Sequence, residues 1–285
     1  MKKTRMLASF VIALAAIGCQ SAPEKHYALQ AEVISTSPVR GLITVKHGDI
    51  PGLMPAMTMQ YSVADTRQIE KLQPGDKISA DLVVSESKGL LEKIALVSKG
   101  TGAASPDTSQ HIPEKGDEVP DFALVNQDDK PIHFHDFRGK VLLVTFIYTR
   151  CPLPDFCPRM NENFREIQKQ LLATPLSQAD TVFLSISFDP GHDTPAVLKN
   201  YASIYNKQAK GQPSFDWQFA APSEKDLPEI ANFFGLVTQK EGSQIIHSLS
   251  TTLIGPDGKI QQWYDSNDWD PAQVAQRVAE LLLKT

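Results

Sequence analysis

Cysteine is scarce in this chain, whose 285 residues contain only three, at positions 19, 151 and 157. A count this low leaves room for one cysteine pair and excludes a domain held together by several disulfides. Long apolar runs are lacking too, because the longest, residues 6–17, is too short to span a bilayer. The 28 basic residues are outnumbered by 33 acidic ones, so nothing indicates a nucleic-acid partner.

The N-terminus has the parts of a secretory signal peptide. Lys2, Lys3 and Arg5 precede the apolar run, which ends in Gly18-Cys19. This ending resembles that of bacterial lipoproteins, in which the cysteine is lipidated after cleavage. We therefore expect a signal peptide over residues 1–18, a lipid anchor on Cys19 and a tether over 19–26, on the periplasmic side of a bacterial membrane. Plain cleavage without lipidation is the alternative, and the sequence leaves open which membrane holds the anchor.

Two domains follow, separated by a linker over residues 99–112 that is rich in Gly, Pro and small polar residues. Residues 27–98 alternate short β-patterned runs with turn signals, which predicts a small all-β barrel. Residues 113–285 alternate strand and helix patterns and end in a hairpin, at 251–254 and 259–263, and a helix from Pro271. That order predicts an α/β thioredoxin-like domain.

The second domain places Cys151 and Cys157 between an apolar strand pattern and a helical pattern. A thiol at a helix N-terminus is favoured as the thiolate, the form that attacks disulfides and binds soft metals. Pro158 suits a first helical position, so we expect Cys157 at the helix start and Cys151 across the loop. The spacing leaves open both a Cys151–Cys157 disulfide in the oxidised protein and a shared metal in the reduced one.

A histidine near the closing hairpin is the second clue to this site. In thioredoxin-like oxidoreductases a cis-proline opens the hairpin strand, and the matching position here is Ser250. This argues against a dedicated disulfide exchanger and leaves His247 free to approach the thiols. Two thiolates and an imidazole suit copper, with Cu(I) favoured by sulfur and Cu(II) tolerated through nitrogen.

Three ordered motifs in the second domain, at residues 149–158, 185–195 and 247–248, resemble the Sco/SenC family. The resemblance covers residues 113–284, although this chain has five residues between its cysteines where the family usually has three. It implies a membrane-tethered thioredoxin fold that binds copper through Cys151, Cys157 and His247 and helps to assemble the dinuclear copper centre of cytochrome c oxidase. Asp189 matches an acidic position near the family's site, which implies a role in orienting His247 or a thiol; a turn residue ahead of Pro190 is the alternative.

The first domain clusters three methionines, Met54, Met57 and Met59, downstream of His47. On a strand Met57 and Met59 project from the same face, and thioethers with an imidazole select Cu(I) or Ag(I) over zinc. The run resembles the periplasmic copper-binding CusF family, a five-stranded OB-like barrel, which implies His47, Met57 and Met59 as ligands. Met54 stands where that family has a tryptophan over the metal, as a further ligand or a lid. Methionines that merely fill the barrel core are the alternative.

These features together suggest a lipid-anchored periplasmic copper metallochaperone, a carrier rather than an enzyme. The first domain would capture Cu(I), and the second would receive it for the copper-centre subunit of cytochrome c oxidase. Other periplasmic copper carriers and the membrane itself are the further partners expected. Two alternatives stay open: a thiol-disulfide reductase acting on the cysteines of the oxidase copper site, and a copper or redox sensor.

Overall fold

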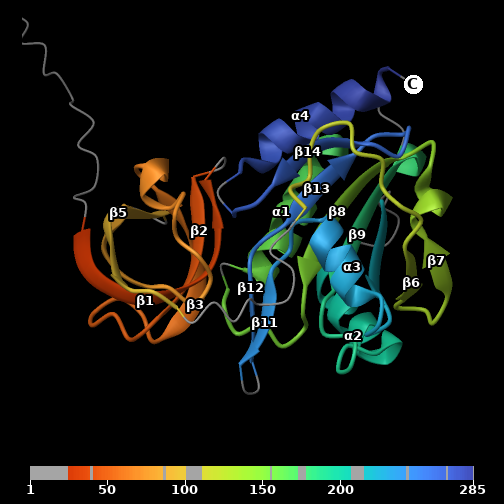
Figure 1. Cartoon of the computed structure of the whole chain (residues 1–285). Coiled ribbons are helices and arrows are strands. Elements are labelled where there is room, and N and C mark those ends of the chain that lie inside the picture. The colour runs from red at the N-terminus through yellow and green to blue at the C-terminus, as the bar shows by residue number, and fades with distance from the viewer. Residues whose placement is uncertain are drawn as a thin grey trace, which may run out of the picture.

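A β-barrel is followed along the chain by an α/β domain (Figure 1). The computed structural model describes residues 25–38, 41–85, 88–100, 111–154, 156–172, 178–206, 215–241, 244–267 and 269–284. The expected signal peptide and Cys19 lie outside these residues. No helix among the described residues is long and apolar enough to cross a membrane.

Five strands close the barrel in the order β1-β2-β3-β5-β4. They are β1 (Lys25–Ser37), β2 (Leu42–His47), β3 (Met57–Val63), β4 (Lys77–Ser85) and β5 (Lys88–Ser98), with a short 3-10 helix at Thr66–Gln68. Alternate residues such as Leu29, Ala31 and Val33 of β1 are buried while their neighbours face outwards, as expected of strands with one buried face. The all-β barrel predicted from the sequence is therefore confirmed.

The second domain is built on a seven-stranded sheet of order β14-β13-β8-β9-β10-β6-β7. Its strands are β6 (Ala123–Asn126), β7 (Pro131–His133), β8 (Val141–Ile147), β9 (Thr181–Ser187), β10 (Asp216–Ala221), β13 (Thr251–Ile254) and β14 (Ile260–Tyr264). Every residue of the central strands β8 and β9 is buried. These strands are parallel neighbours, and parallel strands of this kind are covered on both faces.

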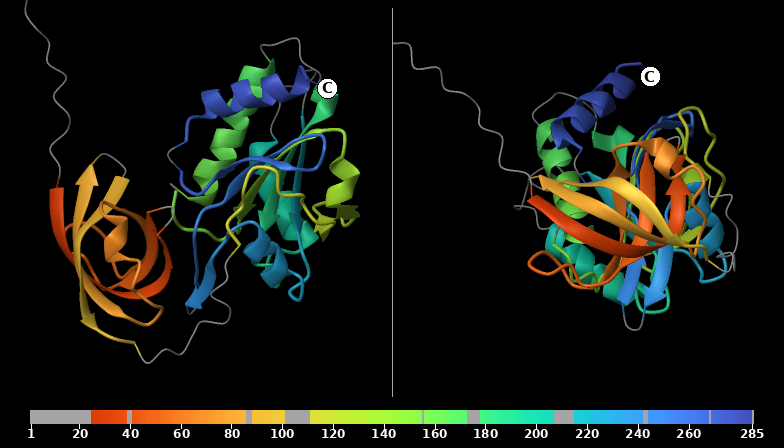
Figure 2. Two further views of the ribbon diagram at one scale, coloured as in Figure 1. Left: turned by 45° about the horizontal axis from the view of Figure 1, so that its top comes forward. Right: turned by 60° about the vertical axis from the view of Figure 1, so that its left-hand side comes forward.

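Four helices pack against this sheet: α1 (Cys157–Leu172), α2 (Pro195–Tyr205), α3 (Leu227–Phe233) and α4 (Pro271–Leu282). Helices α1 and α4 lie side by side (Figure 2). The ring of Phe234, at the end of α3, packs 5.4 Å from that of Phe146 in β8. The strand, loop, helix, strand order with a closing hairpin and helix confirms the thioredoxin-like fold.

A short hairpin of β11 (Thr238–Glu241) and β12 (Gln244–His247) stands apart from the main sheet. Its strand β12 contacts β3 of the barrel. The described ends of the predicted linker are attached to the two domains, since the Gly100 N–H donates to Asp76 and His111 stacks on Phe233. Residues 101–110 lie outside the described part of the chain.

Candidate metal sites

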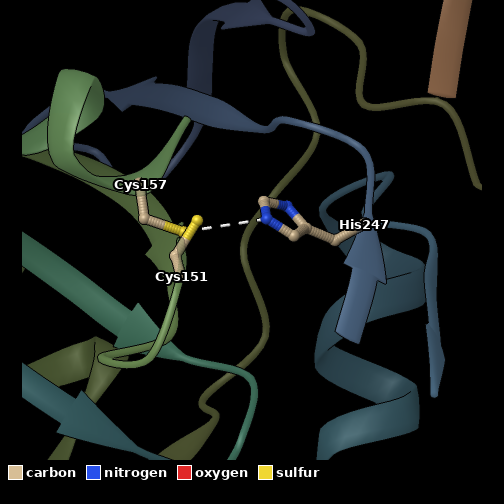
Figure 3. Close-up of side chains that lie close together, drawn as sticks. All are labelled: Cys151, Cys157 and His247. Carbon is tan, nitrogen blue, oxygen red and sulfur yellow. Dashed lines mark hydrogen bonds between the residues drawn. The ribbon is translucent and has the colours of Figure 1, made fainter. Parts of the chain in front are cut away.

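Three side chains from separate elements converge where β8 ends (Figure 3). Cys151 lies in the loop after β8, Cys157 opens α1 and His247 ends β12. Their ligand atoms all lie within 4.8 Å of one another, and Cys157 Sγ is 3.7 Å from His247 Nε2. The prediction that Cys157 sits at the helix start is confirmed.

The five residues between the cysteines do not hold the sulfurs apart. A turn closes within the loop, in which the Phe156 N–H donates to the Leu153 carbonyl at 3.2 Å and the Arg159 N–H donates to the Pro154 carbonyl. This turn takes up the additional residues and returns the chain to α1. Both cysteines are free thiols in this structure, so the wide spacing is compatible with a shared site.

The orientation of His247 is fixed by a backbone carbonyl. Its Nδ1 lies 2.8 Å from the carbonyl oxygen of Ser248, and because a carbonyl only accepts, Nδ1 carries the proton. Nε2 therefore presents a lone pair to the sulfurs, as a metal ligand must. The rings of Tyr148, Phe156 and Phe188 surround the imidazole at 5.7, 5.7 and 4.6 Å.

The two thiols differ strongly in acidity. The hydrogen bond from Cys157 lowers the pKa of Cys151 from 9.0 to about 4, although burial opposes this shift. Burial, reinforced by the neighbouring Cys151 sulfur, raises the pKa of Cys157 well above its ordinary value. The pair therefore holds one thiolate, at half-buried Cys151, and one proton, on fully buried Cys157. A thiolate is the form that binds a soft metal or attacks a disulfide.

Two carboxylates accept hydrogen bonds from the residues at the start of the dithiol loop. Arg150 donates to Asp189 at 2.6 Å, so Asp189 is placed against the loop arginine. Asp193 accepts from the Thr149 N–H at 3.0 Å, from the Thr149 hydroxyl at 2.6 Å and from Ser187 at 2.6 Å. Sequence reasoning missed Asp193, although it lies in the motif at residues 185–195.

Ser250 contributes packing rather than chemistry at the sulfurs. Its hydroxyl donates to the Phe234 carbonyl at 2.7 Å and accepts from the Trp263 indole N–H at 2.9 Å. The residue is buried, and the described residues contain no cis peptide bond. The position predicted to replace the cis-proline thus links β13 to the end of α3 and to β14.

The barrel presents a second histidine in the same arrangement. The register of β2 and β3 pairs His47 with Met57 and Val45 with Met59. The Nδ1–H of His47 donates to the Gly48 carbonyl at 2.7 Å, which leaves Nε2 as a bare acceptor. This atom is buried and has no hydrogen-bond partner. Such an orphan costs about 1–3 kcal/mol unless a ligand satisfies it, and a metal ion is such a ligand.

Two thioethers lie near this histidine around a buried phenol. The hydroxyl of Tyr61 is 3.8 Å from the sulfur of Met54 and 3.7 Å from that of Met59. The rings of Tyr61 and His47 are 6.1 Å apart. The sulfurs of Met54 and Met59 therefore both lie beside the Tyr61 hydroxyl, while the side chain of Met57 lies outside the described part. Tyr61 was missed, although its position two residues after Met59 on one strand places both on the same face.

Both domains of the chain are similar to known proteins. Residues 110–283 match the sequence model of the SCO1/SenC family, and residues 26–96 match that of the copper binding periplasmic protein CusF. A SCO1 protein homolog from Bacillus subtilis is 35% identical over 159 residues, which cover 54% of this chain and 77% of the relative. A mitochondrial SCO2 homolog from Mus musculus is 28% identical, over 50% of this chain and 54% of the relative.

Solved structures share the fold of the second domain. BsSco, described as a member of the Sco family of cytochrome c oxidase assembly proteins, is 31% identical, with a TM-score of 0.50 over 61% of this chain and 99% of its own. A SCO1/SenC family lipoprotein from Bacillus anthracis is 25% identical, with a TM-score of 0.51 over 61% of this chain and 99% of its own. The sequence match covers more than half of the chain and falls on the domain that holds the dithiol site. This chain belongs to the SCO1/SenC family.

Proposed function

We propose that this protein is a copper carrier that binds one Cu(I) in each domain and delivers copper to the copper-centre subunit of cytochrome c oxidase. The observation that carries the proposal is the convergence of Cys151, Cys157 and His247, whose ligand atoms lie within 4.8 Å of one another. Two sulfurs and one imidazole nitrogen form a donor set that favours Cu(I). The recipient is inferred from BsSco, a member of the Sco family of cytochrome c oxidase assembly proteins.

The dithiol site is preorganised for a soft cation. Cys151 supplies a thiolate, His247 presents Nε2, and Cys157 contributes its sulfur once its proton leaves for solvent. Asp193 and Asp189 hold the loop that carries Cys151 through hydrogen bonds from Thr149 and Arg150. The barrel site, with neutral thioether and imidazole donors, needs no deprotonation to bind Cu(I) and is insensitive to thiol oxidation.

Copper stoichiometry under two redox conditions tests this function. Anaerobic equilibrium dialysis of the full mature chain against a Cu(I) chelator should give two bound coppers per reduced protein and one per disulfide-oxidised protein. The variant His247→Ala should weaken the dithiol site by roughly 100-fold or more, since even supporting residues cost 10–100-fold. The exposed His135 offers a matched control as His135→Ala. If oxidation leaves the number of coppers bound per protein unchanged, the proposal is wrong.

A thiol-disulfide reductase is the second candidate, and the unequal acidity of the two thiols favours it. Cys151 is the half-buried thiolate that could attack a target disulfide, and Cys157 is the buried thiol that would resolve the mixed disulfide. Reduction of a disulfide-bonded peptide carrying the oxidase copper-ligand cysteines separates the two functions. His247→Ala should weaken copper binding at the dithiol site but spare peptide reduction, whereas wild type that reduces no peptide would exclude the enzyme.

The location proposed is the periplasmic side of a bacterial membrane, with the chain held by a lipid on Cys19. The support is the signal-like N-terminus and the lipoprotein relative from Bacillus anthracis. Expression of the full chain with a radiolabelled fatty acid should label wild type and leave Cys19→Ser unlabelled. An unlabelled wild-type protein found in the soluble periplasmic fraction would contradict the anchor.

A further inference from the structure

The barrel meets the α/β domain at one place that bears on both metal sites. Strand β3, which opens at Met57 and contains Met59, contacts β12, which ends at His247 (Figure 1). One strand of each site therefore takes part in the same contact. Since β12 is four residues long and a strand rises about 3.3 Å per residue, no residue of β12 lies more than about 10 Å along the strand from His247.

The strands that meet here have free edges among the described residues. β3 is hydrogen-bonded to β2 along most of its length but to β5 only at Ser62 and Val63. β12 pairs with β11 on one side and with no strand on the other. Free strand edges are places where another segment docks, and in this molecule each of the two edges belongs to an element that carries a predicted metal ligand.

The side of β3 available for this contact can be assigned from burial. Tyr61 and Val63 are buried in the barrel core, so β12 must meet β3 from its outward side or its free edge. Because Met59 shares the inward face with Tyr61, copper held there would reach β12 past the free edge of β3, which β5 pairs with only at Ser62 and Val63. Of the outward residues, Gln60 is half-buried whereas Ser62 is exposed. Gln60, beside Met59, is therefore the more covered of these two outward side chains, and Ser62 is the one open to solvent.

We propose that the contact between β3 and β12 is a transfer interface, across which Cu(I) passes within one molecule between the His47, Met57, Met59 site and the Cys151, Cys157, His247 site. This inference rests on the proposed copper-carrier function and adds a route to it. The barrel is thus the donor that the dithiol site takes copper from. The transfer needs no encounter with a second protein.

The chemistry of the transfer is ligand exchange without a redox change. Bonds from Cu(I) to thioether sulfur and the His47 nitrogen break as bonds to the two cysteine sulfurs and the His247 nitrogen form. The Cys157 proton is released to solvent, and copper stays Cu(I) throughout. Anionic thiolates bind Cu(I) more strongly than neutral thioethers do, so copper moves towards the reduced dithiol, and oxidation of Cys151 and Cys157 to a disulfide reverses the preference.

The test uses the mature full chain with isotope-labelled methionine methyl groups, of which the sequence after residue 18 has four. The barrel of the disulfide form is loaded with one equivalent of Cu(I) without oxygen. Transfer is then started with enough phosphine reductant that doubling it leaves the half-time unchanged. Because a phosphine can itself bind Cu(I), Cys151→Ser/Cys157→Ser is treated in the same way, and its methyl signals should stay shifted by copper. The copper-shifted methyl signals should return to their copper-free positions with a half-time that is the same after a tenfold dilution of the protein. A half-time that lengthens in proportion to dilution would show transfer between molecules and overturn the proposal.

Variants of β3 locate the route. Gln60→Arg, with Gln60→Glu as a second change, should lengthen the half-time by about tenfold or more, since loss of docking lowers the effective concentration of one site at the other. The matched control Ser62→Arg should transfer like wild type. Transfer in both Gln60 variants at the wild-type rate would overturn the assignment to this contact.

The proposed function is checked separately in the same conditions. The chains Met57→Leu/Met59→Leu and Cys151→Ser/Cys157→Ser should each bind one Cu(I). If one of them binds none, the two-site carrier itself fails. If both bind and transfer still depends on dilution, the carrier stands and only the interface is wrong.

Discussion

Histidine orientation at the residue scale is the feature that the two sites share. In each, Nδ1–H donates to the carbonyl of the next residue, Gly48 for His47 and Ser248 for His247. The bond is local, so it forms without help from distant elements and leaves Nε2 as a free acceptor, which lies 3.7 Å from the Cys157 sulfur in the dithiol site and is buried in the barrel. A backbone carbonyl that accepts from Nδ1–H in this way fixes the tautomer that metal binding requires. The same local device therefore prepares an imidazole in a barrel and in an α/β domain.

The acidity of Cys151 gives a prediction about pH. Its pKa of about 4 lies below the ordinary 9.0, so the thiolate is present above pH about 4 and is lost as the pH falls through that value. The ultraviolet absorbance of the thiolate should therefore persist from neutral pH down to pH 5. In Cys157→Ala, which removes the hydrogen bond that is the main cause of the shift, the midpoint should move up towards the ordinary value. A wild-type midpoint near 9 would contradict this account.

Asp193 gives a second prediction at this scale. Asp193→Asn replaces one acceptor oxygen by an amide that donates, so the bonds from Thr149 and Ser187 cannot all form. We expect a loss of about 1–3 kcal/mol in the free energy of unfolding and roughly 10–100-fold weaker copper binding at the dithiol site. Urea unfolding and chelator competition measure the two effects. The exposed Asp216→Asn is the control, and unchanged copper affinity in Asp193→Asn would refute the role.

The residues of the site that sequence reasoning found were those with distinctive chemistry. Cysteine, histidine and clustered methionine are rare enough for their spacing to indicate a metal. Asp193 and Tyr61 were missed because their roles depend on distance in space: Asp193 reaches Thr149 across 44 positions of sequence. An aspartate ahead of a helix and a tyrosine in a strand usually have ordinary structural roles. Only the folded chain distinguishes Asp193 and Tyr61 from other residues of these types.

At the scale of elements, periodicity was enough to predict the central strands and helices. The apolar runs of β8 and β9 and the helix signals of α1 and α4 are local, so their positions could be predicted within a few residues. The order of the sheet could not, because it depends on which strands pair. The contact of β12 with β3 also lies beyond sequence patterns, since it joins segments of two domains.

A glycine in β5 makes the packing around the barrel site testable. A Cβ at Gly89 would lie 2.9 Å from the Tyr61 ring and 3.2 Å from Leu82, so Gly89→Ala must displace the ring whose hydroxyl contacts Met54 and Met59. Overpacking of this kind costs about 1–3 kcal/mol, and Cu(I) affinity of the barrel should fall. Val97→Ala, on the same strand, is the matched control because the Val97 side chain is 61% exposed. Equal stability and affinity of the two variants by urea unfolding and chelator competition would contradict the packing argument.

At the scale of the whole molecule, the described residues form two hydrophobic cores, one inside the barrel and one around the central sheet. Separate cores support separate folding, while the contact between β3 and β12 is small compared with either core. The division allows one site to depend on thiol redox state while the other does not. Cu(I) can therefore stay bound to the thioethers of the barrel while the dithiol is oxidised, and can transfer to the dithiol once the dithiol is reduced.

Calorimetry of the full chain tests this division. We expect two unfolding transitions, and Cu(I) should raise the midpoint temperature of both in the reduced wild type. A ligand at 100 times its dissociation constant adds about 2.7 kcal/mol to the free energy of unfolding of the domain that binds it. In Cys151→Ser/Cys157→Ser only the barrel transition should rise, and in Met57→Leu/Met59→Leu only the other. A single cooperative transition whose midpoint temperature rises when copper binds at either site would show that the domains unfold together. Copper at the barrel would then stabilise the dithiol domain even when the cysteines are absent, which the two separate cores do not predict.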